Sequence, residues 1–273
     1  MALLTPEDLE NLLDKLEYNE KVITNVTGSG IKQICEETYN TFPGSEVVGI
    51  VPVTSGNGII DNFTASLAAI VNHFGLKGFV TEHTDISGYH EAVSRRADIV
   101  MMADDHIFIA HNLKNGKIST NHECTGIIYS EIAARYLHAD STDILVIGLG
   151  RVGYAGASHL AKKGFNVYAC DPNWEFLEKA VKELGVKPYE RNSGKKFSMI
   201  MEATPCKDTI SEGMVSDRCL VSTPGIPCGL PGNIGKKYKV DMVMEPLVIG
   251  VASMLYSVFD ETAKFNGLRE NIK

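Results

Sequence analysis

The sequence predicts an α/β fold in two domains: a smaller N-terminal parallel α/β domain, residues 1–139, and a C-terminal Rossmann domain, residues 140–273. Three observations predict it. Apolar runs typical of buried strands alternate with helical patterns in both halves of the chain. One of these runs, residues 144–147, leads directly into the pattern Gly-x-Gly-x-x-Gly. The length of 273 residues suits two domains of ordinary size.

The glycine pattern consists of Gly148, Gly150 and Gly153, placed where a strand turns into a helix. The first glycine permits a tight turn, the second lets the backbone approach a pyrophosphate, and the third lets helix and strand pack closely. The unpaired N–H groups at the start of the next helix, around Arg151 and Val152, favour the negative charge of a phosphate. The pattern therefore predicts a dinucleotide site, although a glycine-rich turn in another α/β protein would also contain it.

An acidic residue follows at the spacing that dinucleotide-binding domains use. A helical pattern over residues 151–163 ends at Gly164, a strand is expected over 165–170, and Asp171 stands at its end. A carboxylate there hydrogen-bonds the adenosine ribose hydroxyls. It also repels the 2′-phosphate of NADP, and no Arg or Lys follows until Lys179, so the expected cofactor is NAD.

Three further strands of the C-terminal domain each end in a proline-containing loop. They are expected over residues 197–201, 219–222 and 241–244. The first two loops, which carry Thr204, Pro205 and Thr223, are expected to contact the cofactor because topology places them beside the glycine loop; the alternative is two ordinary turns. Glu245 ends the third strand and is a candidate substrate contact. A final helix is expected from Leu247 to about Thr262.

The N-terminal domain repeats the alternation of strands and helices. A helix starting at Thr5-Pro6-Glu7-Asp8 carries a leucine stripe, and it either docks on the body of the protein or serves as a lid. A type I′ hairpin is expected at Asn115-Gly116, and a long helix over residues 125–137 joins the domains, with their boundary near 139–142. The other elements are helices 31–39, 62–74 and 87–95, strands 47–53, 77–81 and 98–103, and hairpin strands 106–112 and 117–120.

The carboxyl ends of the first domain's strands define a second candidate site. Ligands of such sheets bind beyond these ends, here at Thr54-Ser55, Glu82-His83 and Asp104-Asp105. The first of these loops continues to Asn57, and its backbone N–H groups and hydroxyls suit a carboxylate, while Asp104 suits an ammonium group. An amino-acid-like substrate requires both, although a plain turn and a helix or hairpin cap are the alternatives. No catalytic base is assigned; Asp104 and Ser55 are the best candidates.

Composition excludes several classes of function. The net charge is 26 − 34 = −8 with no basic run longer than two residues, so no nucleic acid is expected as a partner. No signal peptide and no apolar run of the ~20 residues that cross a bilayer are found. Six cysteines without a C-x-x-C pair predict reduced thiols in a cytoplasmic protein. His106, His111 and His122 lack ligand spacing, so no metal is expected. A homodimer is expected from the general frequency of twofold assemblies.

Several segments resemble the PylD family of NAD-dependent pyrrolysine-biosynthesis dehydrogenases, and the likeness extends over nearly the whole chain apart from a tail after about Phe259 that is longer than the family needs. The segments are the opening Met-Ala-Leu-Leu-Thr-Pro-Glu-Asp-Leu-Glu, Val-Gly-Ile-Val-Pro-Val-Thr-Ser-Gly-Asn-Gly-Ile-Ile (48–60), Met-Ala-Asp-Asp (102–105), Ala-His-Asn-Leu-Lys-Asn-Gly-Lys-Ile (110–118), Cys-Thr-Gly-Ile-Ile-Tyr (124–129), Val-Ser-Thr-Pro-Gly-Ile-Pro-Cys (221–228) and Glu-Pro-Leu-Val-Ile-Gly (245–250).

The resemblance implies the last step of pyrrolysine synthesis, an amine dehydrogenase reaction on the dipeptide-like (3R)-3-methyl-D-ornithyl-N6-L-lysine. The terminal amine would be oxidised by NAD to an imine and hydrolysed to an aldehyde, and the pyrroline ring would then close. Leu4 and Thr5, at the start of the N-terminal helix, are candidate lid contacts to this substrate.

Two other functions fit parts of the sequence. A shikimate-dehydrogenase-like oxidoreductase shares the two-domain plan, and Asn25-Val-Thr27 resembles its substrate loop. The Pro-His-Lys that should follow is replaced by Gly28-Ser-Gly, so the catalytic lysine has no candidate. A non-catalytic NAD sensor would keep the glycine loop and Asp171 but would not need a polar site in the first domain.

Overall fold

The computed structural model describes residues 12–56 and 62–261 and divides them into two compact units. The six-stranded unit comprises Leu13–Ile31 and Thr125–Ile249, and the five-stranded unit comprises Lys32–Cys124 and residues 250–261. This grouping differs from the expected boundary at 139/140, because the border after Cys124 falls inside helix α6 (Asn121–Ala134) and the border after Ile249 inside helix α10 (Val248–Val258).

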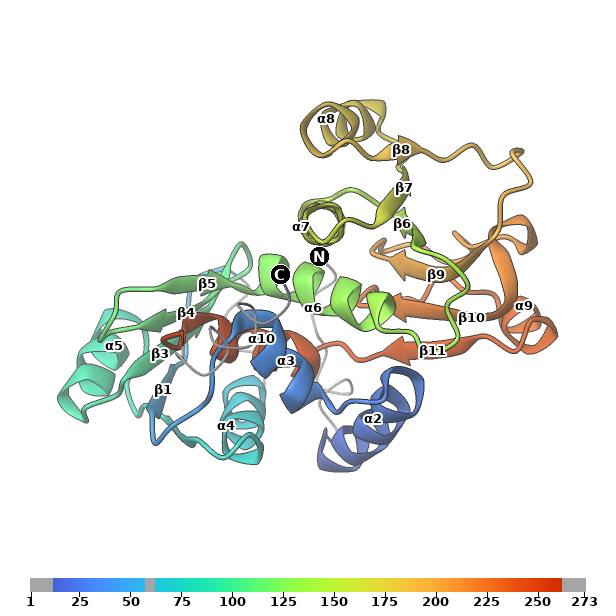
Figure 1. The fold of residues 1–273 in the computed structure, drawn as a ribbon. Coiled ribbons are helices and arrows are strands. Elements are labelled where there is room, and N and C mark those ends of the chain that lie inside the picture. The colour runs from blue at the N-terminus through green and yellow to red at the C-terminus, as the bar shows by residue number, and fades with distance from the viewer. Residues whose placement is uncertain (1–11, 57–61, 262–273) are drawn as a thin grey trace, which may run out of the picture. The chain divides into compact units, whose positions relative to one another are not determined.

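The six-stranded unit contains one fully parallel sheet in the order β11-β10-β9-β6-β7-β8. Counted along the chain from β6, this is the Rossmann order 3-2-1-4-5-6, so the predicted fold class is confirmed (Figure 1). The strands are β6 (Asp143–Ile147), β7 (Asn166–Cys170), β8 (Lys187–Pro188), β9 (Phe197–Glu202), β10 (Val215–Thr223) and β11 (Asp241–Met244).

Two parts of this sheet were not anticipated. The strand β8 has only two residues, both exposed, so it has no apolar run to mark it. The first half of β10 contains the polar sequence Ser-Asp-Arg, and its register against β9 shifts between Val215 and Leu220. An irregular, polar strand segment lacks the alternation of apolar and polar residues by which a strand is predicted.

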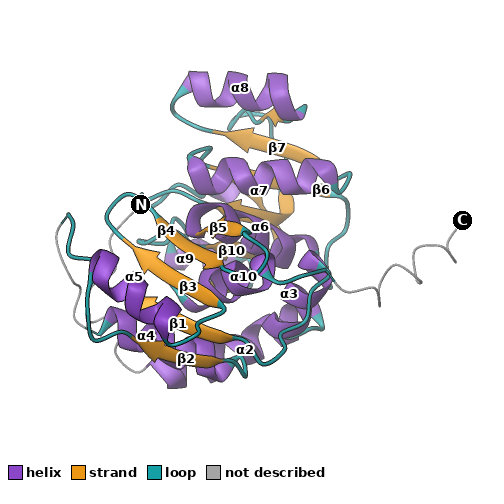
Figure 2. Ribbon diagram, turned by 90° about the vertical axis from the view of Figure 1, so that its left-hand side faces the viewer, coloured by secondary structure: helices purple, strands orange, loops and turns teal. Residues whose placement is uncertain are grey.

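The helices of the six-stranded unit are α2 (Leu12–Thr27), most of α6, α7 (Arg151–Lys162), α8 (Trp174–Leu184) and α9 (Gly232–Lys237), with one 3₁₀ turn, η1 (Glu212–Met214). The expected helices after the glycine loop and after Asn173 are confirmed: Asn173 accepts from the Glu175 N–H at 3.0 Å, and α8 ends at Gly185 with φ +70°. α7 and α8 pack against each other (Figure 2), which brings two consecutive crossovers to one face of the sheet. Asn25-Val-Thr27 is the end of α2, not a loop.

The five-stranded unit has the order β2-β1-β3-β4-β5. Its strands are β1 (Val47–Val51), β2 (Lys77–Val80), β3 (Ile99–Ala103), β4 (Phe108–Asn112) and β5 (Ile118–Thr120). The first three are parallel as expected, but β4 and β5 are antiparallel, so the sheet is mixed rather than parallel.

The hairpin between β4 and β5 exists, but the prediction of a type I′ turn is wrong: Gly116 has φ +73°, whereas Asn115 is not among the residues with positive φ. The Asn112 side chain instead accepts from the Lys114 and Asn115 N–H groups.

Two helices cover opposite faces of the parallel part of this sheet (Figure 2). Gly78 of β2 faces Val71 of α4 (Phe63–His73), whereas Gly49 of β1, one position out of register with Gly78, faces Ala92 of α5 (Asp85–Ser94). Neighbouring residues of a strand point to opposite faces, so the two helices cannot share one. Small residues at these points let the helices approach closely.

Helix α10 belongs with the five-stranded unit rather than with the Rossmann sheet that precedes it. The hydroxyls of Tyr39 and Ser253 lie 2.5 Å apart, Thr41 Oγ1 donates to the Tyr256 carbonyl at 2.8 Å, and Asn112 Nδ2 donates to the Val258 carbonyl at 3.0 Å. Tyr39 is the last residue of helix α3 (Ile31–Tyr39), whose bounds match those predicted from the sequence. The expected division of the chain assigned this last helix to the C-terminal domain, and these bonds explain why it groups with the five-stranded unit instead.

Candidate functional site

The glycine loop has the geometry that a pyrophosphate site requires. Gly148 has φ +86°, and a Cβ on Gly153 would overlap the Gly148 carbonyl oxygen. A Cβ on Gly150 would have no neighbour within 4 Å, so the space above this residue is open. Gly150 is also the N-cap of α7 and provides no side chain to bond the first N–H groups, which belong to Arg151 and Val152. Uncapped N–H groups beside open space fit a phosphate.

Asp171 lies at the end of β7, beside β6, where the sequence predicts it. Its Oδ2 accepts from the Leu149 N–H at 2.6 Å and its Oδ1 from the Asn173 N–H at 2.8 Å. One carboxylate therefore holds the middle of the glycine loop and the entry to α8. Its expected bond to a ribose remains a prediction.

Glu202 is the residue of this site that the sequence analysis missed. It ends β9, is fully buried, and pairs in register with Ile147, which directly precedes the glycine loop. Its carboxylate accepts from the backbone N–H of Thr204 at 3.1 Å and from the hydroxyls of Thr204, Thr209 (3.2 Å) and Thr223 (2.9 Å). An acid directly after the apolar run Phe-Ser-Met-Ile-Met is the one signal that could have found it.

Glu202 joins the two loops that were expected to contact the cofactor. Thr204 and Thr223 both donate their hydroxyls to it, while Pro205 is exposed. The first loop also abuts the glycine loop, because a Cβ on Gly148 would lie 2.7 Å from Thr204 Cγ2. A Cβ on Gly225 would overlap the Thr204 carbonyl oxygen, so the two loops touch each other. Thr204, Pro205 and Thr223 are thus gathered near the glycine loop; their contact with a cofactor remains a prediction.

Glu245 has structural contacts at the position predicted for a substrate contact. Its carboxylate accepts from the Leu247 N–H at 3.0 Å and from the Ile249 N–H at 3.0 Å, and only 4% of the residue is exposed. The Tyr129 hydroxyl donates to the Glu245 carbonyl and accepts from its N–H at 3.0 Å. This buried tyrosine fixes the end of β11, and burial raises the pKa of its hydroxyl.

In the five-stranded unit, the loop after β1 is held by a residue that the sequence analysis did not select. Asp85 accepts from the Thr54 N–H at 2.9 Å and from the Thr54 hydroxyl at 2.7 Å, and the hydroxyl bond is the main cause that lowers the pKa of Asp85. The Asp85 backbone has φ +55°, which is uncommon outside glycine and favoured by Asp and Asn. Thr54 is therefore committed to Asp85, whereas its neighbour Ser55 is exposed.

The ends of β1 and β3 meet, as the topology predicts. A Cβ on Gly56 would overlap the Asp105 carboxylate, so this acid lies against the loop that carries Ser55. Asp104 is exposed, and its Oδ1 accepts from the N–H groups of His106 and Ile107, both at 2.8 Å. The Ile107 and then the His106 bond lower the pKa of Asp104, which keeps it anionic. The predicted contacts Leu4, Thr5 and Asn57 lie outside the described residues.

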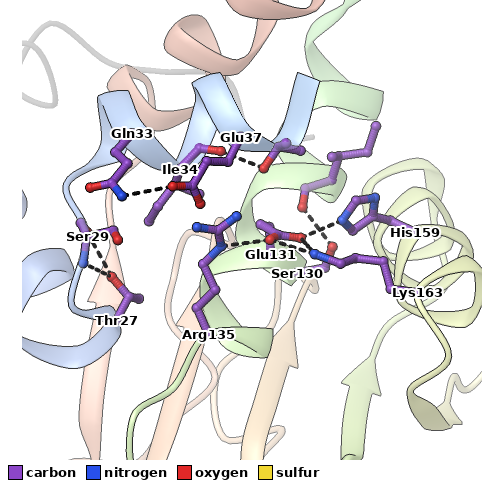
Figure 3. A network of polar contacts seen from close by, with 12 residues as sticks. Thr27, Ser29, Gln33, Ile34, Glu37, Ser130, Glu131, Arg135, His159 and Lys163 are labelled. Atoms are coloured by element: carbon purple, nitrogen blue, oxygen red, sulfur yellow. Dashed lines mark hydrogen bonds and ion pairs between the residues drawn. The ribbon is translucent and has the colours of Figure 1, made fainter. Parts of the chain in front are cut away.

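A second buried acid ties α6 to α7 within the six-stranded unit (Figure 3). Glu131 accepts from Arg135 Nε at 2.7 Å, from His159 Nε2 at 2.7 Å and from Lys163 Nζ at 2.7 Å. Burial raises its pKa, but the bonds from His159 and Lys163 outweigh burial and hold the pKa well below its usual range. His159 and Lys163 lie at the C-terminal end of α7, at the opposite end of this helix from the glycine loop, where the charge of Lys163 also favours the helix dipole.

The described part of the chain has no group of three or more His, Cys, Asp or Glu side chains that could hold a metal ion. All six cysteines are free thiols. None of the helices in residues 12–56 and 62–261 is long and apolar enough to cross a membrane.

Solved structures define the fold class. Shikimate 5-dehydrogenase from Thermus thermophilus, in complex with NADP(H) and shikimate, has a TM-score of 0.52 at 13% identity and covers 83% of this chain and 100% of its own. Quinate dehydrogenase from Corynebacterium glutamicum, in complex with NAD, has a TM-score of 0.51 at 12% identity, covering 78% and 92%. At this identity the likeness concerns the fold alone: the α/β fold of these two-domain dehydrogenases.

Sequence relatives identify the family within this fold class. The model of "Pyrrolysine biosynthesis protein PylD, N-terminal domain" matches residues 8–119. The pyrrolysine synthases of Methanosarcina acetivorans and Methanosarcina barkeri are each 56% identical over 258 residues, which is 94% of this chain and 100% and 98% of theirs. The chain belongs to the PylD family of pyrrolysine biosynthesis proteins.

Proposed function

We propose that this chain is an NAD-dependent pyrrolysine synthase, which oxidises the terminal amine of (3R)-3-methyl-D-ornithyl-N6-L-lysine and forms the pyrroline ring. The observation that carries the proposal is the 56% identity to pyrrolysine synthases over 94% of the chain. The open space at Gly150 and the acid at Asp171 support a dinucleotide. A shikimate-type activity has only the fold in its favour.

The residues of the glycine loop would hold the cofactor. The N–H groups at the start of α7 would bind the pyrophosphate, and Asp171 would bind the adenosine ribose and exclude a 2′-phosphate. Thr204, Pro205 and Thr223 would flank the nicotinamide. When bound, the nicotinamide supplies a hydride acceptor.

The strand ends of the five-stranded unit would bind the amino-acid-like substrate. Ser55 and the loop around it would hold the carboxylate of the substrate, and Asp104 would hold its ammonium group. The bonds that Asp104 accepts from the N–H groups of residues 106 and 107 keep the Asp104 side chain in place. Leu4, Thr5, Asn57 and Glu245 complete the proposed set.

Chemistry requires the site to deprotonate the amine before oxidation. An alkyl amine has a pKa near ~10.4, and only the neutral amine has a lone pair to expel a hydride from the adjacent carbon. Desolvation lowers that pKa, whereas a nearby carboxylate such as Asp104 raises it, so orientation by Asp104 opposes deprotonation. The carbon would give up its hydride to the nicotinamide as the nitrogen lone pair forms the C=N bond, and loss of a proton from the nitrogen would leave the neutral imine. Water converts the imine to an aldehyde and ammonia, and the ornithine α-amine condenses with the aldehyde, losing water, at a high effective concentration.

Absorbance at the reduced-nicotinamide band tests the proposal. The protein is mixed with 3-methylornithyl-lysine and NAD, with NADP in a parallel reaction. We expect signal with NAD and none with NADP, and pyrrolysine in the product by mass spectrometry. NAD binding without any turnover would contradict the amine oxidation and favour a sensor.

Asp104→Asn is expected to reduce turnover at least 100-fold while changing NAD affinity less than twofold, because the variant loses the negative charge of an ion pair with the substrate. The amide oxygen can still accept the two backbone bonds that shape the turn. Steady-state kinetics and a separate NAD titration measure the two effects. Turnover equal to that of the wild type would remove Asp104 from the assignment. The neighbouring Asp105→Asn serves as a charge-matched control for a general electrostatic effect.

A further inference from the structure

Glu202 is a fully buried carboxylate that the proposed function does not yet use. Besides the bonds from Thr204, Thr209 and Thr223, it accepts from the Gly229 N–H at 3.4 Å. Two of its donors are backbone N–H groups, which can only donate, and one of them reaches each carboxylate oxygen.

Among the residues that the structure describes, Glu202 forms no ion pair with Lys, Arg or His, whereas Glu131, equally buried, is bonded to three basic side chains. Within the described residues, a negative charge on this carboxylate is therefore stabilised by hydroxyl and backbone N–H dipoles. Such a charge acts strongly on its surroundings, because little water is present to screen it.

The position of Glu202 places this charge at the switch point of the sheet. The strands β7 and β9 lie on the two sides of β6, and ligands of open α/β sheets bind where the connections diverge in this way. Glu202 pairs with Ile147, the residue before the glycine loop. The loops that it bonds, after β9 and after β10, are those proposed to flank the nicotinamide.

We propose that Glu202 is a positioning residue that fixes these two loops and makes the site prefer the oxidised, cationic nicotinamide over the neutral reduced one. The proposal rests on the proposed binding of a nicotinamide cofactor. NAD+ and NADH differ by one positive charge on the ring, so an unpaired buried carboxylate nearby stabilises only the oxidised form. A preference of this kind favours the reactant and the release of the reduced product.

The test compares dissociation constants for NAD+ and NADH by calorimetry, without substrate. In the wild type we expect a ratio Kd(NAD+)/Kd(NADH) of about one or less. In Glu202→Gln we expect the ratio to rise about tenfold, which corresponds to about 1.4 kcal/mol. The rise should come mainly from weaker NAD+ binding. An unchanged ratio in a folded Glu202→Gln protein would overturn the proposal.

Thr209→Val is the matched control. It removes one hydroxyl donor from the same carboxylate and leaves the charge in place. A purely structural role predicts that both variants weaken NAD+ and NADH together, whereas our proposal predicts a changed ratio in Glu202→Gln alone. If Glu202→Gln does not fold, the wild type still decides: NADH bound more than tenfold more tightly than NAD+ would overturn the proposal.

These measurements separate this inference from the proposed function. A wild-type protein that binds neither dinucleotide would defeat both. Binding of both forms with the same ratio in wild type and variant would defeat only the role of Glu202. Pyrrolysine formation together with an unchanged Kd(NAD+)/Kd(NADH) ratio in Glu202→Gln would likewise support the synthase activity and contradict the role of Glu202.

Discussion

Gly150→Ala is expected to weaken NAD binding at least 100-fold while leaving stability unchanged within about 0.5 kcal/mol. The added methyl group meets no atom within 4 Å, and φ of −62° suits alanine, so the fold has no reason to change. The same methyl group would occupy the space through which a pyrophosphate approaches the backbone. Calorimetric titration with NAD and thermal unfolding measure the two effects.

Gly153→Ala is expected to damage binding and stability together. Its methyl group would overlap the Gly148 carbonyl oxygen, so the strand-to-helix turn must shift, at a cost of about 1–3 kcal/mol. Gly164→Ala, at the other end of α7, is the control: with φ +84° and no neighbour within 4 Å, it should cost about 1 kcal/mol of stability and nothing in binding. NAD affinity unchanged in Gly150→Ala would show that the pyrophosphate does not lie on this loop.

The contrast between these glycines shows what the sequence could predict. Spacing alone identified the turn, and the structure agrees: Gly148 has a positive φ, Gly153 abuts the Gly148 carbonyl five residues before it, and Gly150 faces open space. The strands β6, β7 and β9 and the helices α3, α7 and α8 were predicted for the same reason, since their signals are local apolar periods and caps. Asp171 was found because its distance from the loop is fixed by one helix and one strand.

The residues that were missed depend on partners far along the chain. Glu131 bonds His159 and Lys163, 28 and 32 positions away, and Thr54 bonds Asp85, 31 positions away. Glu202 is bonded by side chains as distant as Thr223, 21 positions on. Acidic residues usually lie on the surface, so a single acid in a helix or at a strand end predicts solvent exposure unless the tertiary partners are known.

Tertiary structure also decided the grouping of helices. The pattern of α10 predicts a buried helix but not the unit on which it packs, and its bonds to Tyr39, Thr41 and Asn112 are formed by residues more than 140 positions away. The hairpin turn failed for a smaller reason: the Asn112 side chain took over the bonds of a tight turn, which a two-residue motif does not reveal.

Glu131→Gln is expected to lower the free energy of unfolding at pH 7 by about 3 kcal/mol. Its carboxylate is fully buried and balances Arg135, His159 and Lys163, and a neutral amide would leave these basic groups without an anion. This cost lies at the lower end of the range for broken buried ion pairs because Lys163 is 43% exposed, so water compensates part of the lost ion pair. Urea unfolding at pH 7 measures the difference between wild type and variant.

The difference in the free energy of unfolding between wild type and Glu131→Gln depends on pH, and the pKa shift of Glu131 determines its sign. The pKa of Glu131 is lower in the folded state than in the unfolded state, so its stabilisation is complete above the unfolded pKa of about 4.3 and is lost as the pH falls toward the folded value. The difference between wild type and Glu131→Gln should therefore be present at pH 7 and shrink below pH ~4.3. Glu212→Gln, which breaks an exposed pair with Lys237, should cost much less stability, because water screens this pair. A Glu131→Gln cost no larger than this control would show that the four-residue cluster contributes nothing beyond a surface ion pair.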